Sequence, residues 1–165
     1  MATGNDGDLR VAAASLSNLP SWYVGEETRT LDLGRVLLLT NWRGEGRPTD
    51  FIIMLMPMDK PAYLLVVPQV LWEQLAIKRE PSGLFNDRER RAGRVIGKRS
   101  ISQSLDKAGR LLLPEEAGHI FKADKQVVLL GCTHSFEIWP VDGYKDPIAE
   151  TDWAQFQKYL EEKNL

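Results

Sequence analysis

A repeated glycine–arginine pair followed by an apolar run constrains the fold of this 165-residue chain more than any other feature of its sequence. Residues 31–39 read LDLGRVLLL, and residues 105–114 read LDKAGRLLLP. Arg35 and Arg110 therefore each follow a turn glycine and precede a short apolar run, 75 positions apart. Self-similarity at a fixed separation is the mark of a duplicated structural unit, which should show further matches between the two halves.

A second pair of similar segments follows the first pair in the same order. YLLVVPQVLW at 63–72 resembles FEIWPVDGY at 136–144, and Pro68 and Pro140 are 72 positions apart. The two separations differ by three residues, which is consistent with one ancestral unit that carries a longer loop in its first copy. The sequence therefore predicts two copies of a unit made of a turn, a strand, a short helix or loop, a β-hairpin and a short helix.

Alternation of apolar and polar residues, with turn and capping residues between the runs, places the elements of each copy. We expect strand–turn–strand at 31–40, a loop at 44–50, and further strands at 51–56, 62–67, 101–105, 126–130 and 135–139. Residues 106–114 should form a turn, a strand and a terminating proline, and helices are expected at 69–78, 86–99, 115–121, 140–144 and 151–165. One such unit would bury too little apolar surface to be stable, whereas two units that interleave their strands would share one barrel core. The expected fold is therefore mainly β with short helices and pseudo-twofold symmetry.

The same reading divides the chain into segments. We expect a flexible N-terminal tail, a first repeat, a basic connecting helix, a second repeat and a C-terminal helix, at 1–21, 22–80, 81–99, 100–148 and 149–165.

Composition excludes several classes of protein. Hydrophobic residues make up 43% and charged residues 27% of the chain, which is a globular balance. The longest uncharged apolar run, 51–58, is far shorter than the roughly 20 residues that a membrane-spanning helix needs. The N-terminus lacks the features of a secretory signal, and the single cysteine, Cys132, excludes an internal disulfide. We therefore expect a reduced, cytoplasmic protein without a membrane partner.

Charge is distributed unevenly along a chain whose net charge is −2. Residues 86–110 contain eight basic residues against three acidic ones. Such a local basic stripe is the footprint that a DNA-binding protein needs, although runs of charge are also common on solvated helix faces. Both interpretations stay open for Arg88 to Arg94, whereas Lys98 and Arg99 favour DNA because they lie closer to Arg110 in the sequence.

The stretch 105–139 resembles the second half of MraZ proteins, bacterial regulators built from two AbrB-like swapped-hairpin units. The matching residues are an Asp-x-x-x-Arg element with its glycine, a proline after the strand, a strand ending in glycine, and Phe-Glu-Ile-Trp: Asp106, Gly109, Arg110, Pro114, Gly131 and 136–139. YVGE at 23–26, TLDLGR at 30–35 and Arg43 extend the resemblance to about residues 22–148. The resemblance implies an AbrB-like swapped-hairpin β-barrel, a homo-oligomer that forms a ring, nucleoid association, and binding to short direct repeats in promoter DNA.

The resemblance and the basic stripe together give the candidate site. The expected DNA contacts are Arg35, Arg43, Lys98, Arg99, Lys107 and Arg110, and the expected motif and turn residues are Asp32, Gly34, Asp106, Gly109 and Pro114. An arginine at the tip of a turn can reach a phosphate or a guanine edge with two hydrogen bonds. Alternatively, Asp106 and Arg110 pair with each other and fix the turn. Asp106 is expected to orient its neighbours rather than to contact DNA, because phosphate repels a carboxylate.

The chain departs from the MraZ pattern at several positions. Asp32 and Arg35 are three apart rather than four, Leu33 and Ala108 stand where lysine is expected, Leu39 replaces the proline, and Gly118 replaces an arginine. These departures leave a second hypothesis open, in which the chain is a degenerate MraZ-like oligomeric protein-interaction module with little or no DNA binding.

No pattern in the sequence predicts catalysis. His119, His134 and Cys132 lack the spacing of a metal site, and no Gly-rich phosphate loop is present. Ser102, Ser104, His134 and Asp142 form no recognisable nucleophile arrangement. We expect no enzymatic activity, no cofactor, no metal and no small-molecule substrate. We also expect Tyr63, Trp72, Phe136 and Trp139 to pack in the core.

Overall fold

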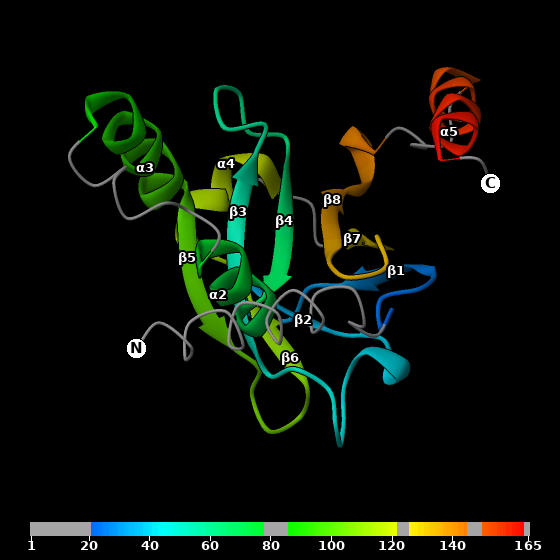
Figure 1. Ribbon diagram of the computed structural model, residues 1–165. Coiled ribbons are helices and arrows are strands. Elements are labelled where there is room, and N and C mark those ends of the chain that lie inside the picture. The colour runs from blue at the N-terminus through cyan, green and yellow to red at the C-terminus, as the bar shows by residue number, and fades with distance from the viewer. Residues whose placement is uncertain (1–20, 78–85, 122–125, 145–149, 164–165) are drawn as a thin grey trace, which may run out of the picture.

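A computed structural model describes residues 21–77, 86–121, 126–144 and 150–163 (Figure 1). The chain is mainly antiparallel β with short helices, as the sequence predicts. Nearly all of the predicted tail, residues 1–20, lies outside the described residues. No helix in the described part of the chain is both long enough and apolar enough to cross a membrane.

The two halves of the chain contain the same series of strands. The first half comprises β1 (Glu26–Thr30), β2 (Arg35–Leu37), η1 (Thr40–Trp42), β3 (Asp50–Met56), β4 (Tyr63–Pro68) and α2 (Gln69–Ile77). After α3 (Asp87–Arg99), the second half comprises β5 (Ser100–Ser104), β6 (Arg110–Leu112), η3 (Glu115–Ala117), α4 (Gly118–Phe121), β7 (Gln126–Gly131), β8 (Phe136–Pro140) and η4 (Val141–Gly143). The C-terminal helix is α5 (Glu150–Glu162).

Strand pairing shows that the two repeats are interleaved. The large sheet has the order β1-β7-β8-β4-β3-β5, and β2 pairs with β6 in a separate two-stranded ribbon. Exchanging each strand for its counterpart in the other repeat gives the same order, counted from the opposite edge of the sheet. Each repeat lends its first strand to the hairpin of the other, because β1 pairs with β7 and β5 pairs with β3. The predicted pseudo-twofold organisation is confirmed, while the segment boundaries stay predictions.

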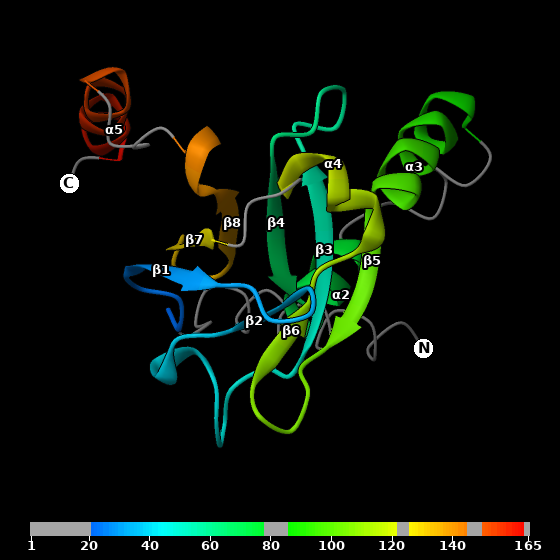
Figure 2. The same ribbon diagram turned by 180° about the vertical axis from the view of Figure 1, so that it is seen from behind.

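The registers place the pseudo-twofold axis. Leu65 pairs with Glu137 at the centre of the β4/β8 contact, and Val36 pairs with Leu111 at the centre of the ribbon. In the described residues the edge strands β1 and β5 do not pair with each other, so no continuous hydrogen-bonded barrel is formed. The ribbon instead lies across the sheet between these edges (Figure 2).

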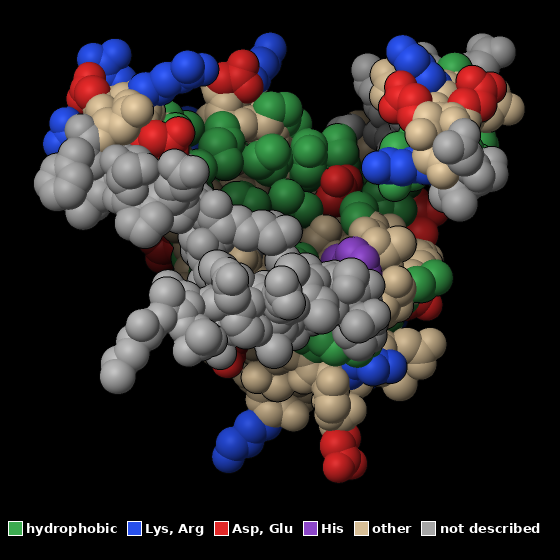
Figure 3. All heavy atoms as spheres, in the orientation of Figure 1, with side chains coloured by type: hydrophobic (Ala, Val, Ile, Leu, Met, Phe, Trp, Pro, Cys, Tyr) green, Lys and Arg blue, Asp and Glu red, His purple; other side chains and the backbone are tan. Residues whose placement is uncertain are grey.

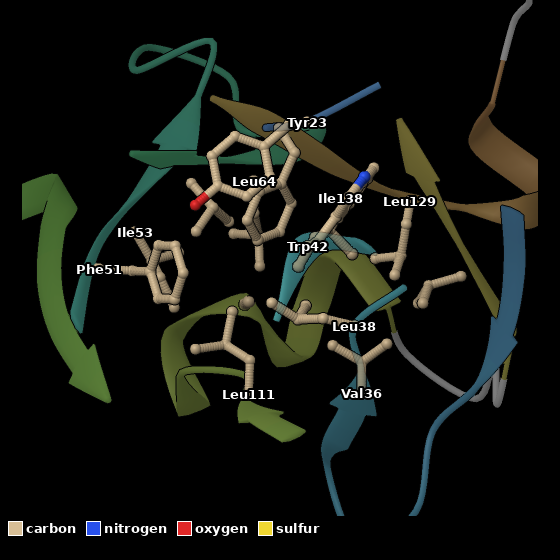
Figure 4. Close-up of a cluster of buried hydrophobic side chains, with 14 of the residues drawn as sticks. Tyr23, Val36, Leu38, Trp42, Phe51, Ile53, Leu64, Leu111, Leu129 and Ile138 are labelled. Carbon is tan, nitrogen blue, oxygen red and sulfur yellow. The ribbon is translucent and has the colours of Figure 1, made fainter. Parts of the chain in front are cut away.

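The core lies between the sheet and the ribbon. Alternate residues of each strand face inward, because side chains of a strand point to opposite faces in turn. Figure 4 shows Val36 and Leu111 of the ribbon on one side of the cluster, with Leu64 and Ile138 of the sheet on the other; all four are fully buried. Four buried aromatic rings join the halves, with Phe136 5.1 Å, 5.0 Å and 5.7 Å from its partners, Tyr23, Trp42 and Phe51.

Two details of the sequence prediction are corrected. Tyr63, Trp72 and Trp139 are half-buried and lie outside the buried core, whereas Phe136 lies in it as expected. Trp139 follows the inward-facing Ile138, so the strand period of two turns it to the outer face, where its ring stacks on Tyr63 at 4.2 Å. This outer face shows hydrophobic side chains between α3 and α5 (Figure 3).

The strand–turn–strand predicted at 31–40 also begins earlier. Its first strand is β1, which ends at Thr30, and the turn occupies the residues that were expected to start the strand. Leu33 and Gly34 adopt positive φ angles of 50° and 73°, which a strand cannot accommodate.

Candidate nucleic-acid interface

Two tight turns carry Arg35 and Arg110 into the ribbon. In the second turn, Gly109 N donates to Asp106 O at 3.0 Å and Asp106 N donates to Arg110 O at 2.9 Å. Gly109 has a φ of +84°, and a Cβ at this position would lie 2.4 Å from Cδ of Arg43. The turn therefore requires glycine both for its backbone conformation and for the close approach of Arg43.

The ribbon directs both arginines away from the core. Arg35 is paired with Leu112 and Arg110 with Leu37, on either side of the central Val36–Leu111 pair. Val36 and Leu111 are fully buried, so the alternation of the strands turns both arginines to the outer face. About 37% of the Arg35 side chain and 38% of the Arg110 side chain remain exposed.

Asp106 organises this outer face. Its Oδ1 accepts hydrogen bonds from the backbone N–H groups of Ala108 and Arg110, both at 2.9 Å. Its Oδ2 accepts from Nε of Arg110 at 2.9 Å and lies 3.7 Å from Nη1 of Arg35. The backbone N–H of Arg110, followed by the Arg110 guanidinium and the N–H of Ala108, lowers the pKa of Asp106 below its usual value.

Ion pairs also cross between the repeats. Nη1 of Arg110 lies 3.4 Å from Oδ2 of Asp32, and Arg35 reaches Asp106 of the other repeat. Two arginines and two aspartates thus form one four-charge cluster on the outer face of the ribbon. The predicted pairing of Asp106 with Arg110 is present, together with a partly exposed guanidinium.

Arg43, Lys107 and Pro114 complete the surroundings of the second turn. The half-buried Arg43 donates from Nε to the carbonyl oxygen of Leu38 at 3.0 Å, and its side chain lies over Gly109. Lys107 is exposed in the turn, whereas Pro114 is buried immediately before η3. The structure therefore brings Arg43 and Lys107 close to Arg110.

Lys98 and Arg99 lie away from the two arginine-bearing turns. They occupy the last turn of α3, which begins after the N-cap Asn86 and has no buried residue. β5 separates Arg99 from the second turn, and five residues of strand span roughly 17 Å. Proximity in the sequence therefore does not place these two residues beside Arg110. Arg90 and Arg91 of the same helix form ion pairs with Asp87, at 3.3 Å and 2.8 Å.

Sequence reasoning missed the pairing of Asp32 with Arg110 across the repeats. The signal was present in the duplication itself, because antiparallel pairing of the two equivalent strands brings their flanking turns onto one surface. No cluster of three or more His, Cys, Asp and Glu side chains suited to a metal ion occurs among the residues that the structure describes.

The lowered pKa of Asp106 predicts acid sensitivity. A carboxylate whose pKa is lower in the folded protein stabilises the fold above its ordinary value, 3.8, and loses this contribution as the pH falls through 3.8 toward the folded value. Asp106→Asn should therefore lower the free energy of unfolding at neutral pH, and the gap from the parent protein should narrow below pH 3.8. Urea unfolding of both proteins at neutral pH and below pH 3.8 measures this difference in the free energy of unfolding. A difference that does not depend on pH would contradict the stabilising role of the Asp106 carboxylate.

Comparison with known sequences identifies the family of this chain. A family model described as "MraZ protein, putative antitoxin-like" matches residues 100–165. The Transcriptional regulator MraZ of Methylococcus capsulatus is 30% identical over 135 residues, which cover 81% of this chain and 83% of the relative. That of Pseudomonas syringae pv. syringae is 28% identical over 127 residues, covering 76% and 83% of the two chains. At this identity and coverage, the chain belongs to the MraZ family, whose similar members are named transcriptional regulators.

Proposed function

We propose that this protein is a DNA-binding transcriptional regulator that contacts short direct repeats in promoter DNA through the arginine-bearing turns of an oligomer. The observation that carries the proposal is the outer face of the ribbon, where Arg35 and Arg110 project together from two rigid turns. The strands behind them are anchored in the core by Val36 and Leu111. A rigid carrier lowers the conformational entropy that an arginine loses on binding.

The charge arrangement supports the same role. Asp106 holds the Nε edge of Arg110, so the guanidinium is oriented before DNA arrives, while 38% of the Arg110 side chain remains exposed. A planar guanidinium can then donate two parallel hydrogen bonds to a phosphate or to a guanine. The nearby Lys107 and Arg43 add positive charge to a cluster whose two arginines and two aspartates are balanced.

An oligomer fits this small contact surface. One ribbon offers few contacts to DNA, so a single chain should bind weakly and with little sequence preference. Several copies held together would bind successive DNA repeats, and each further contact would form at a high effective concentration.

One observation favours a second function. Arg35 and Arg110 both already face carboxylates, as a turn with a purely structural role would arrange them. In this alternative, the chain is an oligomeric protein-interaction module that has lost most of its DNA binding.

Gel-shift titration against the DNA upstream of the protein's own gene separates the two functions. The titration is run at two salt concentrations, with a scrambled duplex as the control. A regulator should bind the upstream DNA more tightly than the scrambled duplex and should lose affinity as salt rises, because phosphate contacts release counterions. An intact oligomer that binds neither duplex at low salt would contradict the regulator and support the protein-interaction module instead.

Lys98 and Arg99 are proposed as phosphate contacts at a distance from the turns. Replacing both with alanine should weaken binding to every sequence by a similar factor and reduce the slope of log affinity against log salt by roughly one to two. Arg90→Ala/Arg91→Ala is the matched control, because it removes two cations of α3 that already pair with Asp87. If the affinity and the slope of the Lys98/Arg99 variant were unchanged, these two residues would not contact DNA and would only be solvated charges at the end of α3.

A further inference from the structure

Helix α5 presents an aromatic face that the described part of the chain leaves uncovered. Trp153, Phe156 and Tyr159 follow one another at helical spacing, and each is about half exposed. Leu160 extends the same face, and the ring centroids of Trp153 and Phe156 are 6.0 Å apart. Both views show α5 standing apart from the sheet (Figures 1 and 2). An apolar stripe of this size on a helix indicates an interaction surface.

An apolar groove lies on another part of the molecule. Its volume is about 640 Å³, and it is bounded by the first turn, β5 and the segment that follows β6. The side chains that line it include Leu31, Leu33, Ile101, Leu112, Leu113 and Phe121. Leu33, at the turn, is 91% exposed. Such a groove can receive the apolar face of an amphipathic helix.

The two surfaces are both apolar, and their charged residues are opposite in sign. Glu115 and Glu116 line the groove and are exposed. Lys163 continues the aromatic face of α5, with its Nζ 5.9 Å from the centre of the Tyr159 ring. Glu161 and Glu162 are turned away from that face by the 100° step of the helix. A cation on the helix would thus meet carboxylates on the groove.

We infer that α5 of one copy of this chain docks its aromatic face into the groove of a second copy. α5 lies on the β8 side of the molecule, whereas the groove adjoins β5, the strand at the far edge of the sheet (Figure 1). Each chain then offers its helix to one neighbour and its groove to another. Such a head-to-tail interface builds a ring or a longer assembly rather than a closed dimer. The inference rests on the oligomer of the proposed function but not on its DNA contacts.

A charge placed on the aromatic face should dissociate the assembly into monomers. Phe156→Glu should lower the mass measured by light scattering at micromolar concentration from a multiple of 18.7 kDa to that of the monomer. Ala154→Glu introduces the same charge on the opposite face of α5 and should leave the assembly intact. Circular dichroism of both variants should show that the sheet is retained.

A mixing experiment tests the head-to-tail arrangement. Leu33→Asp alters the groove at an exposed position whose positive φ aspartate tolerates, and it should also give monomers. Phe156→Glu chains keep an intact groove, and Leu33→Asp chains keep an intact α5. A mixture of the two should therefore form a heterodimer of about twice 18.7 kDa and nothing larger.

The outcomes that overturn the inference are distinct. A monomeric parent protein, a Phe156→Glu variant of unchanged mass, or a mixture that stays monomeric while the parent assembles would each exclude this interface. All of these measurements are made without DNA. A protein that assembles in this way but binds no DNA would refute the arginine-turn proposal alone.

Discussion

Replacing Arg110 with alanine is expected to abolish DNA binding by the assembled protein while leaving its fold intact. A bidentate contact between an arginine and a base contributes about 1–3 kcal/mol of discrimination. Because each chain of an oligomer would lose the same contact, the losses should multiply and binding in a gel shift should nearly disappear.

The turn should survive this substitution. Asp106 would still accept hydrogen bonds from the backbone N–H groups of Ala108 and residue 110, which do not depend on the arginine side chain. Partly exposed ion pairs contribute at most about 1 kcal/mol to stability, so the melting temperature should change little.

Two further variants make the Arg110 result specific. Arg110→Lys keeps the charge but cannot form the planar pair of hydrogen bonds, so its affinity should fall between those of the parent and the alanine variant. Lys60→Ala is the control, because Lys60 is exposed in the loop that follows β3. The start of β3 lies next to the second turn and the strand runs away from it, so this variant loses one charge far from Arg110 and should bind DNA normally. A sharp drop in melting temperature with DNA binding retained by the folded fraction would instead make Arg110 the structural partner of Asp106.

The fold could be predicted from the sequence because its strongest signal was a duplication. Two matching segments in the same order gave equivalent strands in both halves, and a unit too small to be stable alone had to share its core with its copy. The interleaving of β1 with β7 and of β5 with β3 follows from that requirement. Side-chain direction along one strand was harder to predict, because FEIWP contains apolar residues on both faces. Only the pairing of β8 shows that Phe136 points inward and Trp139 outward.

The candidate site was only partly predictable. Motif residues near Arg110 came together because one turn holds them, so local sequence was a sufficient guide to Asp106, Lys107 and Gly109. Arg99 is also near in sequence, but β5 is extended, and an extended strand carries neighbours in sequence far apart in space. Asp32 is 78 positions from Arg110, yet the pairing of β2 with β6 brings their side chains within 3.4 Å. Distances of this kind depend on tertiary pairing and cannot be derived from spacing along the chain.

The aromatic centre of the core should make the largest contribution of any single side chain to stability. Phe136 is fully buried and contacts Tyr23, Trp42 and Phe51, which come from three segments of the first repeat. Phe136→Ala would leave a cavity at the junction of the two repeats, and substitutions of this kind destabilise proteins by about 3–5 kcal/mol. For a chain of this length, we expect the melting temperature to fall by roughly 6–20 °C.

Trp139→Ala is the matched control for Phe136→Ala, because both residues belong to β8 and differ in the face they occupy. Trp139 stacks on Tyr63 and donates a hydrogen bond to Glu137 at 2.8 Å, but it is only half-buried on the outer face. Its removal exposes some apolar surface without opening a cavity in the shared core, so the loss of stability should be clearly smaller. Thermal and urea unfolding of the two variants measure the difference. If Trp139→Ala destabilised the chain as much as Phe136→Ala, the outer face of the sheet would be as important to folding as the core between the sheet and the ribbon, and the assignment of inner and outer faces along β8 would be wrong.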